Sequence, residues 1–178
     1  MIAQELKNKN IAEYLIYMWQ IEDLIRANGC DMDMLSHHVL AYYPEAQCKE
    51  TEEWFANLVE MMRAEGVMER GHLQINRNVM QNLQELHAAL LASTQYPFYN
   101  AAYFKALPFI VELRQKGNQV AQESELETCF EALYGLLLLR LQKKEVSAGT
   151  MKAMEAISSF LSLLANYYEK ERKGELEL

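Results

Sequence analysis

Glu22 and Arg26 are two charged residues that lie one helical turn apart in a largely apolar stretch, 10–28. On a helix at 100° per residue, the apolar side chains of this stretch cover more than half of the circumference, which is wider than a surface helix needs. The helix is therefore expected to be covered on several sides. Its enclosed carboxylate and guanidinium can form a structural ion pair, or they can bind a ligand together with Tyr14 and Trp19. The sequence leaves both interpretations open.

Arg140 has a similar position in a second predicted helix, over 124–145, where it lies on the leucine-rich face near the carboxyl end. Its guanidinium can join Glu22 and Arg26 in one network, or it can extend along the apolar face to water. If Arg140 does join Glu22 and Arg26, the three residues can form a structural network or line a ligand pocket.

The histidines do not form a recognisable metal site. Glu69 and His72 have the Glu-x-x-His spacing of di-iron helical bundles, but Gly71 between them disfavours a helix. His37 and His38 are adjacent, so their side chains point in different directions on a helix. The sequence therefore predicts no metal ligand and no cofactor.

Catalytic motifs are also missing from the sequence. It has no HExxH motif, glycine-rich phosphate loop, GxSxG elbow or dinucleotide fingerprint. His87 lies at the edge of an apolar stripe, where a hydrogen-bonded boundary side chain is more common than a catalytic base. We therefore predict no catalytic residue, and the sequence favours a protein that is not an enzyme.

Composition and charge set limits on the location and the partners. The 178 residues are 51% hydrophobic, and 17 basic against 25 acidic residues give a net charge of −8, which disfavours binding to nucleic acid or to an anionic membrane. The first ten residues lack a secretory core, and no apolar run reaches the length of a membrane helix. Cys30, Cys48 and Cys129 are widely spaced and are read as reduced thiols. A cytoplasmic location is expected.

Ten tyrosines are a notable enrichment for a chain of this length. Seven of them fall on or near apolar helix faces, at Tyr14, Tyr17, Tyr99, Tyr103, Tyr134, Tyr167 and Tyr168. Because a buried hydroxyl needs a hydrogen-bond partner, these residues can belong to a core with polar edges, to a subunit interface or to a ligand pocket. A core is the expected role for most of them.

Helical periodicity and capping residues predict an all-α bundle of six or seven helices, with mostly antiparallel neighbours. The expected helices cover 10–28, 31–42, 51–66, 73–93, 98–116, 124–145 and 148–173. They form a single domain over 1–178, and the charged tail after about residue 172 is expected to be frayed.

Three segments resemble a bacterial family that is catalogued as a domain of unknown function. They are NIAEYLIYMWQIEDLI at 10–25, GHLQ at 71–74 and ALP at 106–108. The resemblance runs over nearly the full length and implies a helical fold. It implies no known activity, so no catalytic residue is transferred.

Two hypotheses for the function follow. The first is a helical interaction or scaffold protein that associates with itself, as a possible homodimer, because the apolar arcs are wide and aromatic residues are many. The second is a small-molecule binder or an enzyme with a pocket near Glu22, Arg26 and the tyrosines. Regulation of nucleic acid is disfavoured by the negative charge.

Overall fold

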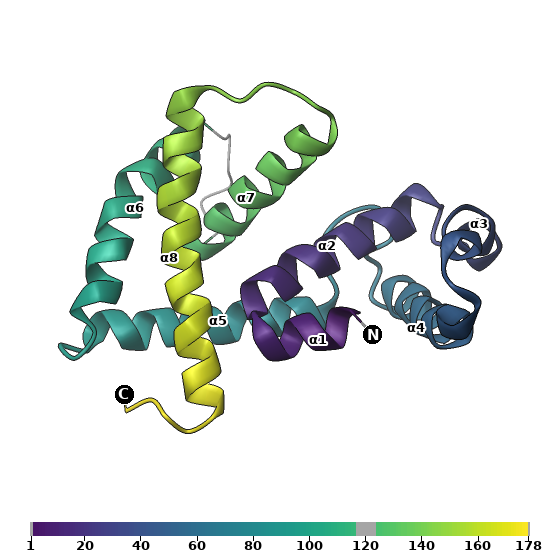
Figure 1. Ribbon diagram of the computed structural model, residues 1–178, viewed down its shortest axis with the longest axis horizontal. Coiled ribbons are helices and arrows are strands. Elements are labelled where there is room, and N and C mark those ends of the chain that lie inside the picture. The colour runs from purple at the N-terminus through teal and green to yellow at the C-terminus, as the bar shows by residue number, and fades with distance from the viewer. Residues whose placement is uncertain (1, 117–123, 178) are drawn as a thin grey trace. The chain divides into compact units, whose positions relative to one another are not determined.

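The computed structural model describes residues 2–116 and 124–177, without the side chains of 45–48, and these residues fold into helices without any strand. Figure 1 shows them in chain order, coloured from purple to yellow. The elements are α1 (Ile2–Lys9), α2 (Ile11–Ala27), α3 (Met32–His38), the 3-10 turn η1 (Leu40–Tyr42), α4 (Glu45–Ala64), α5 (Gln74–Ala92), α6 (Pro97–Lys116), α7 (Glu125–Leu141) and α8 (Ala148–Arg172). The predicted all-α class is confirmed.

Two helix starts differ from the sequence-based expectation. The amino-terminal segment folds as a further helix, α1. Helix α4 begins at Glu45 rather than near Thr51, because Pro44 occupies the N-cap position with a φ of −58° and a ψ of 139°. Proline fits the start of a helix, since its missing N–H would be unpaired there in any case.

Polar side chains start other helices as predicted. The Asp31 carboxylate accepts a backbone N–H in the first turn of α3 at 3.0 Å. Ser124 and Glu127 form a reciprocal capping box at α7, with hydrogen bonds of 3.2 and 2.6 Å. Ser147 caps α8. These bonds satisfy N–H groups that have no partner inside the helix.

The chain divides into two compact units, and the boundary lies within α5. Unit 1 contains Met1–Lys7 and Glu13–Val79, and unit 2 contains Asn8–Ala12 and Met80–Leu178. A single domain over the whole chain therefore stays a prediction. No helix in the described part of the chain has the length and apolar character needed to cross a membrane.

Unit 1 has a core to which α2 contributes several buried side chains. Its buried apolar side chains come from α2, α3, η1, α4 and the connector before α5, and they include Leu15, Met18, Ile21, Ile25, Leu35, Leu40, Phe55, Leu58, Met62, Val67 and Leu73. The wide apolar arc predicted for α2 is thus buried.

Unit 2 has its own core, in which α8 packs against α6 and α7. The buried side chains include Leu83, Leu86, Leu90, Tyr99, Ile110, Phe130, Leu136, Ile157, Phe160, Leu161 and Leu164. Helix α6 continues through Pro108, which lies on its exposed side.

Candidate functional site

The Glu22 carboxylate is the centre of a buried polar network in unit 1, with none of its side chain exposed. Its Oε1 atom accepts hydrogen bonds from the Leu73 N–H at 2.9 Å and from the Asn76 Nδ2 at 2.7 Å. Its Oε2 atom lies 2.6 Å from His72 Nδ1. An interior carboxylate is tolerated only when such donors replace its hydration. Glu22 of α2 therefore holds the amino-terminal end of α5.

His72 lies between Glu22 and the indole of Trp19. The two rings stack with centroids 4.3 Å apart and an angle of 14° between their planes. Because the carboxylate accepts a hydrogen bond from Nδ1, the neutral imidazole carries its proton there and presents Nε2 as an acceptor. The side chain is 35% exposed. The arrangement is a carboxylate–imidazole dyad in which the ring donates from Nδ1 to Glu22.

Arg26 binds the backbone of the connector between α4 and α5. Its guanidinium donates to the Val67 carbonyl, from Nε at 3.3 Å and from Nη2 at 3.2 Å, and also to the Gly71 carbonyl. It pairs with Asp23 at 2.8 Å, whereas the Glu22 carboxylate is 4.0 Å away. Glu22 and Arg26 thus anchor the same connector, and their direct ion pair is the longest contact in the network.

Asn76 was not singled out from the sequence, yet it completes the network. Its side chain is 1% exposed, and its Nδ2 donates to Glu22. Its Oδ1 is the one buried side-chain oxygen or nitrogen without a hydrogen-bond partner among the described residues. The contact with Glu22 joins residues 54 positions apart in the chain, so periodicity alone could not reveal it.

The other ligand-binding candidates occupy different surroundings. Tyr14 is 5% exposed, and the Lys7 ammonium lies 5.5 Å from the centroid of its ring. Arg140 belongs to unit 2, where it is exposed and lines an open groove of about 340 Å³ with Leu133 and Glu155. The structure therefore brings Glu22, Arg26 and Trp19 together within unit 1.

His87 lies in an aromatic cluster of unit 2. Its Nδ1 atom is 2.6 Å from the Tyr99 hydroxyl, and its ring contacts Tyr103 and Phe160 with centroids 5.1 and 5.5 Å apart. The Tyr103 hydroxyl donates to Glu125 at 2.7 Å. Burial lowers the pKa of His87, and burial followed by the Glu125 contact raises the pKa of Tyr103 to about 12. Burial thus favours the neutral forms of His87 and Tyr103, and hydrogen bonds join His87 Nδ1 to Tyr99 and the Tyr103 hydroxyl to Glu125.

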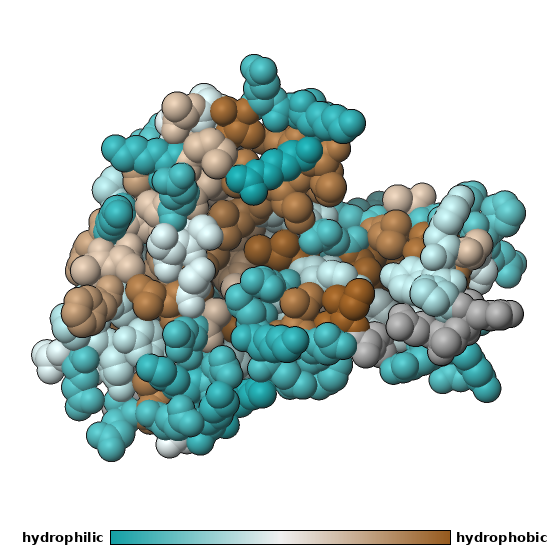
Figure 2. Space-filling view, viewed as in Figure 1, coloured by the Kyte–Doolittle hydropathy of each residue, from teal (hydrophilic) through white to brown (hydrophobic). Residues whose placement is uncertain are grey.

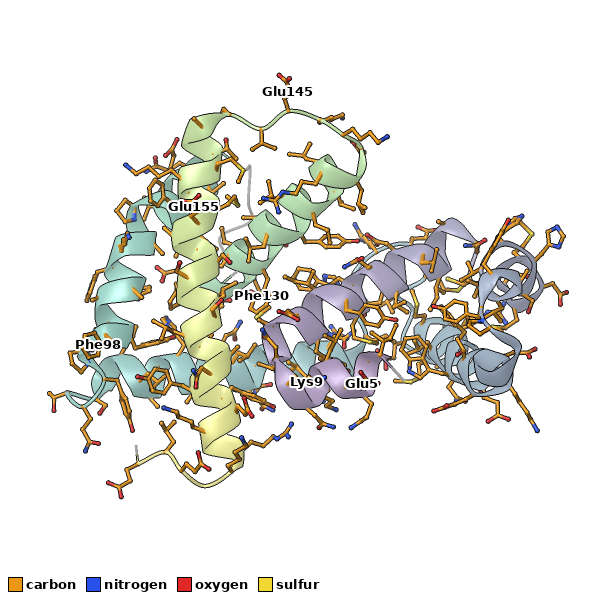
Figure 3. The ribbon with its side chains drawn as sticks, in the orientation of Figure 1. Glu5, Lys9, Phe98, Phe130, Glu145 and Glu155 are labelled. Carbon is orange, nitrogen blue, oxygen red and sulfur yellow. The ribbon has the colours of Figure 1, made fainter. Side chains whose placement is uncertain are left out.

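The outer face of α6 is apolar and exposed. Phe104 is 61% exposed and Val111 is 43% exposed, and both lie opposite the buried face of the helix. Ala101 and Pro108 are exposed on the same face. Figure 2 shows tan and brown residues along this edge of unit 2, and Figure 3 labels Phe98 at the beginning of the helix. Exposed apolar residues that gather on one face are typical of an interaction surface.

Lys105 and Glu112 flank this face. They are seven residues apart, or about two helical turns, and so lie on the same edge of α6. Both are exposed, and Glu112 also pairs with Lys116 at 2.6 Å. We define the α6 face as Ala101, Phe104, Pro108 and Val111 together with this charged edge.

Nearly the whole chain matches the model of a known family. The family described as a domain of unknown function, DUF4924, matches residues 1–175. No curated protein and no solved structure matches the chain.

Proposed function

The chain belongs to the DUF4924 family, whose description names no activity, and we propose that it is a helical interaction protein that forms a homodimer through the α6 face. The observation that supports this proposal is the exposure of Phe104 and Val111 on one side of α6. Burying these side chains against a partner removes apolar surface from water, which is the main driving force of association.

The sequence of the α6 face is self-complementary. In a dimer with twofold symmetry, residue i of one subunit contacts residue j of the other, and j contacts i. Phe104 and Val111 lie at nearly equal distances on either side of Pro108. A twofold axis near Pro108 therefore pairs two antiparallel α6 helices so that Phe104 packs against Val111 of the partner subunit.

The charged edge fits the same arrangement. Lys105 and Glu112 also lie at nearly equal distances on either side of Pro108, so the axis places Lys105 beside Glu112 of the partner subunit. Each dimer contains this pair twice. The existing Glu112–Lys116 pair is well exposed, so exchanging it for the new contact costs little. This charge complementarity favours a second copy of the chain over an unrelated partner.

Light scattering coupled to size exclusion tests the dimer. We expect a mass of about twice 20.7 kDa for the wild type at high micromolar concentration. Phe104→Glu should yield monomer, whereas Leu141→Glu, which changes a comparably exposed apolar residue on α7, should leave the mass unchanged. A wild-type mass of 20.7 kDa across that range would contradict the proposal.

A charge-swap series tests the antiparallel register. Lys105→Glu and Glu112→Lys alone each replace two attractive contacts by two repulsive ones, so each should weaken dimerisation about tenfold or more. The double variant restores attraction and should dimerise nearly as well as the wild type. Lys144→Glu is the matched control for charge, since this exposed lysine lies off the face. A dimer that tolerates both single changes would exclude this register.

The His72–Glu22 dyad favours a second candidate function, catalysis or ligand binding at His72. With Nδ1 as the donor to Glu22, the neutral ring offers Nε2 as a base or nucleophile. The hydrolysis of p-nitrophenyl acetate measures this reactivity directly. His72→Gln should lower the rate about fivefold if the dyad is active, while His37→Gln, at an exposed histidine, serves as the control. Equal rates for the three proteins would remove this candidate.

We place the dimer in the cytoplasm, without a cofactor and without binding to nucleic acid or membrane. The free, buried thiols of Cys30 and Cys129 support a reducing compartment. The net charge of −8 supports the absence of anionic partners.

A further inference from the structure

A small cavity in unit 1 combines aromatic rings with carboxylates. Its volume is about 160 Å³, and its walls include Tyr17, Tyr43 and Trp54 together with Glu5 and Glu50. The cavity shares no residue with the α6 face, because its lining residues belong to unit 1 and α6 belongs to unit 2.

Three helices and the segment before α4 supply the walls. Glu5 comes from α1, where Figure 3 labels it, and Tyr17 comes from α2. Tyr43 precedes α4, and Glu50 and Trp54 are four residues apart on α4, so the carboxylate and the indole project from the same side of that helix. The tertiary structure therefore gathers residues that are distant in the sequence.

The side chains that line the cavity favour a positively charged ligand. The face of an aromatic ring is electron-rich and attracts a cation, and tryptophan does so most strongly. No lysine or arginine is among the described residues that line the cavity, so Glu5 and Glu50 are the charged side chains of that described lining. Burial, and then the neighbouring Tyr43 phenol, raises the pKa of Tyr17, which keeps this side chain neutral.

The size of the cavity limits the ligand. Drug-sized ligands occupy pockets of roughly 300–1,000 Å³, so about 160 Å³ accommodates a head group rather than a whole molecule of that size. A methylated ammonium group is compact and poorly hydrated, and it interacts with several ring faces at once. A bare ammonium ion would lose more hydration on entering the same space.

We propose that this cavity binds a methylated ammonium head group, with Tyr17, Tyr43 and Trp54 around the cation and Glu5 and Glu50 supplying the opposite charge. The head group can belong to a free small molecule such as choline or to a methylated lysine side chain. The shared chemistry is the quaternary or methylated nitrogen. This site does not depend on dimerisation.

Calorimetric titration with choline tests the site, with 3,3-dimethyl-1-butanol as its neutral isostere. We expect choline to bind, the isostere to bind at least about tenfold more weakly, and added salt to weaken choline binding. A peptide containing trimethyllysine and the same peptide with unmodified lysine distinguish the two sources of the head group. Equal binding of choline and its isostere, or no binding of choline or the trimethyllysine peptide at millimolar concentration, would overturn the proposal.

Variants locate the binding in the cavity. Trp54→Leu removes a ring, and Glu50→Gln removes a charge from an exposed position with little effect on packing; each should weaken binding about tenfold. Tyr42→Leu and Glu60→Gln are the matched controls, because both residues are exposed and neither lines the cavity. If Trp54→Leu does not fold, Glu50→Gln still decides. Unchanged choline binding in Glu50→Gln would exclude this placement of the cation.

Discussion

Replacing Glu22 by alanine should destabilise unit 1 by about 3 kcal/mol. The change removes the acceptor of the Leu73 N–H and of the Asn76 Nδ2, and both donors are buried. A buried donor without a partner costs roughly 1–3 kcal/mol. His72 is partly exposed and can bind water instead, so losing its hydrogen bond to Glu22 adds less to the free-energy cost. Denaturant unfolding followed by far-UV circular dichroism measures the difference, which should exceed about 2 kcal/mol.

The neighbouring ion pair provides a matched control for this prediction. Asp23→Ala removes the Arg26–Asp23 pair, whose carboxylate is 50% exposed, and should cost only about 0.3–0.5 kcal/mol. Because Glu22 and Arg26 anchor the same connector, the double change Glu22→Ala with Arg26→Ala should cost less than the sum of the single changes. Sub-kilocalorie, additive effects would refute the structural role of the network. A stable Glu22→Gln protein that loses a bound ligand would instead favour a pocket.

Three further outcomes follow from the burial of titratable groups and from the helix content. Burial lowers the pKa of His87 below its ordinary value of 6.5, so the unfolded chain binds a proton at this residue more readily than the folded chain does. The folded state should therefore lose stability as the pH decreases below 6.5, and none above it, through this residue. His87→Gln should flatten this part of a stability profile. Burial and then the Glu125 carboxylate raise the pKa of the Cys129 thiol to about 12, so this thiol should react with Ellman's reagent at pH 8 only after unfolding. The far-UV circular dichroism spectrum should be dominated by helix, since no strand occurs in the described residues.

Much of the fold could be predicted because its signals are local. Helical periodicity and caps are short-range features, and Ser124 with Glu127 forms the capping box expected from their spacing. The start of α4 was harder to predict from the sequence, because a proline such as Pro44 can end one helix or begin the next. The sequence favours both readings, and tertiary packing decides between them.

The candidate site could be predicted only in part, because most of its contacts join residues that are distant in the sequence. The position of Glu22 inside an apolar arc marks it as buried, and the structure places it there. Its partners Leu73 and Asn76 lie more than 50 positions along the chain and show no periodic signal of their own. Every residue except proline has a backbone N–H, so the sequence cannot indicate that the N–H of Leu73 is the one that binds Glu22. Long-range partners of this kind follow from the path of the connector, which sequence patterns do not describe.

The width of the apolar arc on α2 has a physical cause in these long-range contacts. Trp19 and Glu22 hold the connector and the beginning of α5, whereas Tyr17 lines the cavity with residues of α1 and α4. A helix that packs against several neighbouring elements must bury more than one face, and its contacts help to position each of those elements. The one buried charged group on α2, the Glu22 carboxylate, lies where His72, Leu73 and Asn76 supply hydrogen bonds to it. Because these contacts hold α2 against the connector, Tyr17 is already placed as one wall of the cavity before a ligand enters, and such preorganisation lowers the entropic cost of binding.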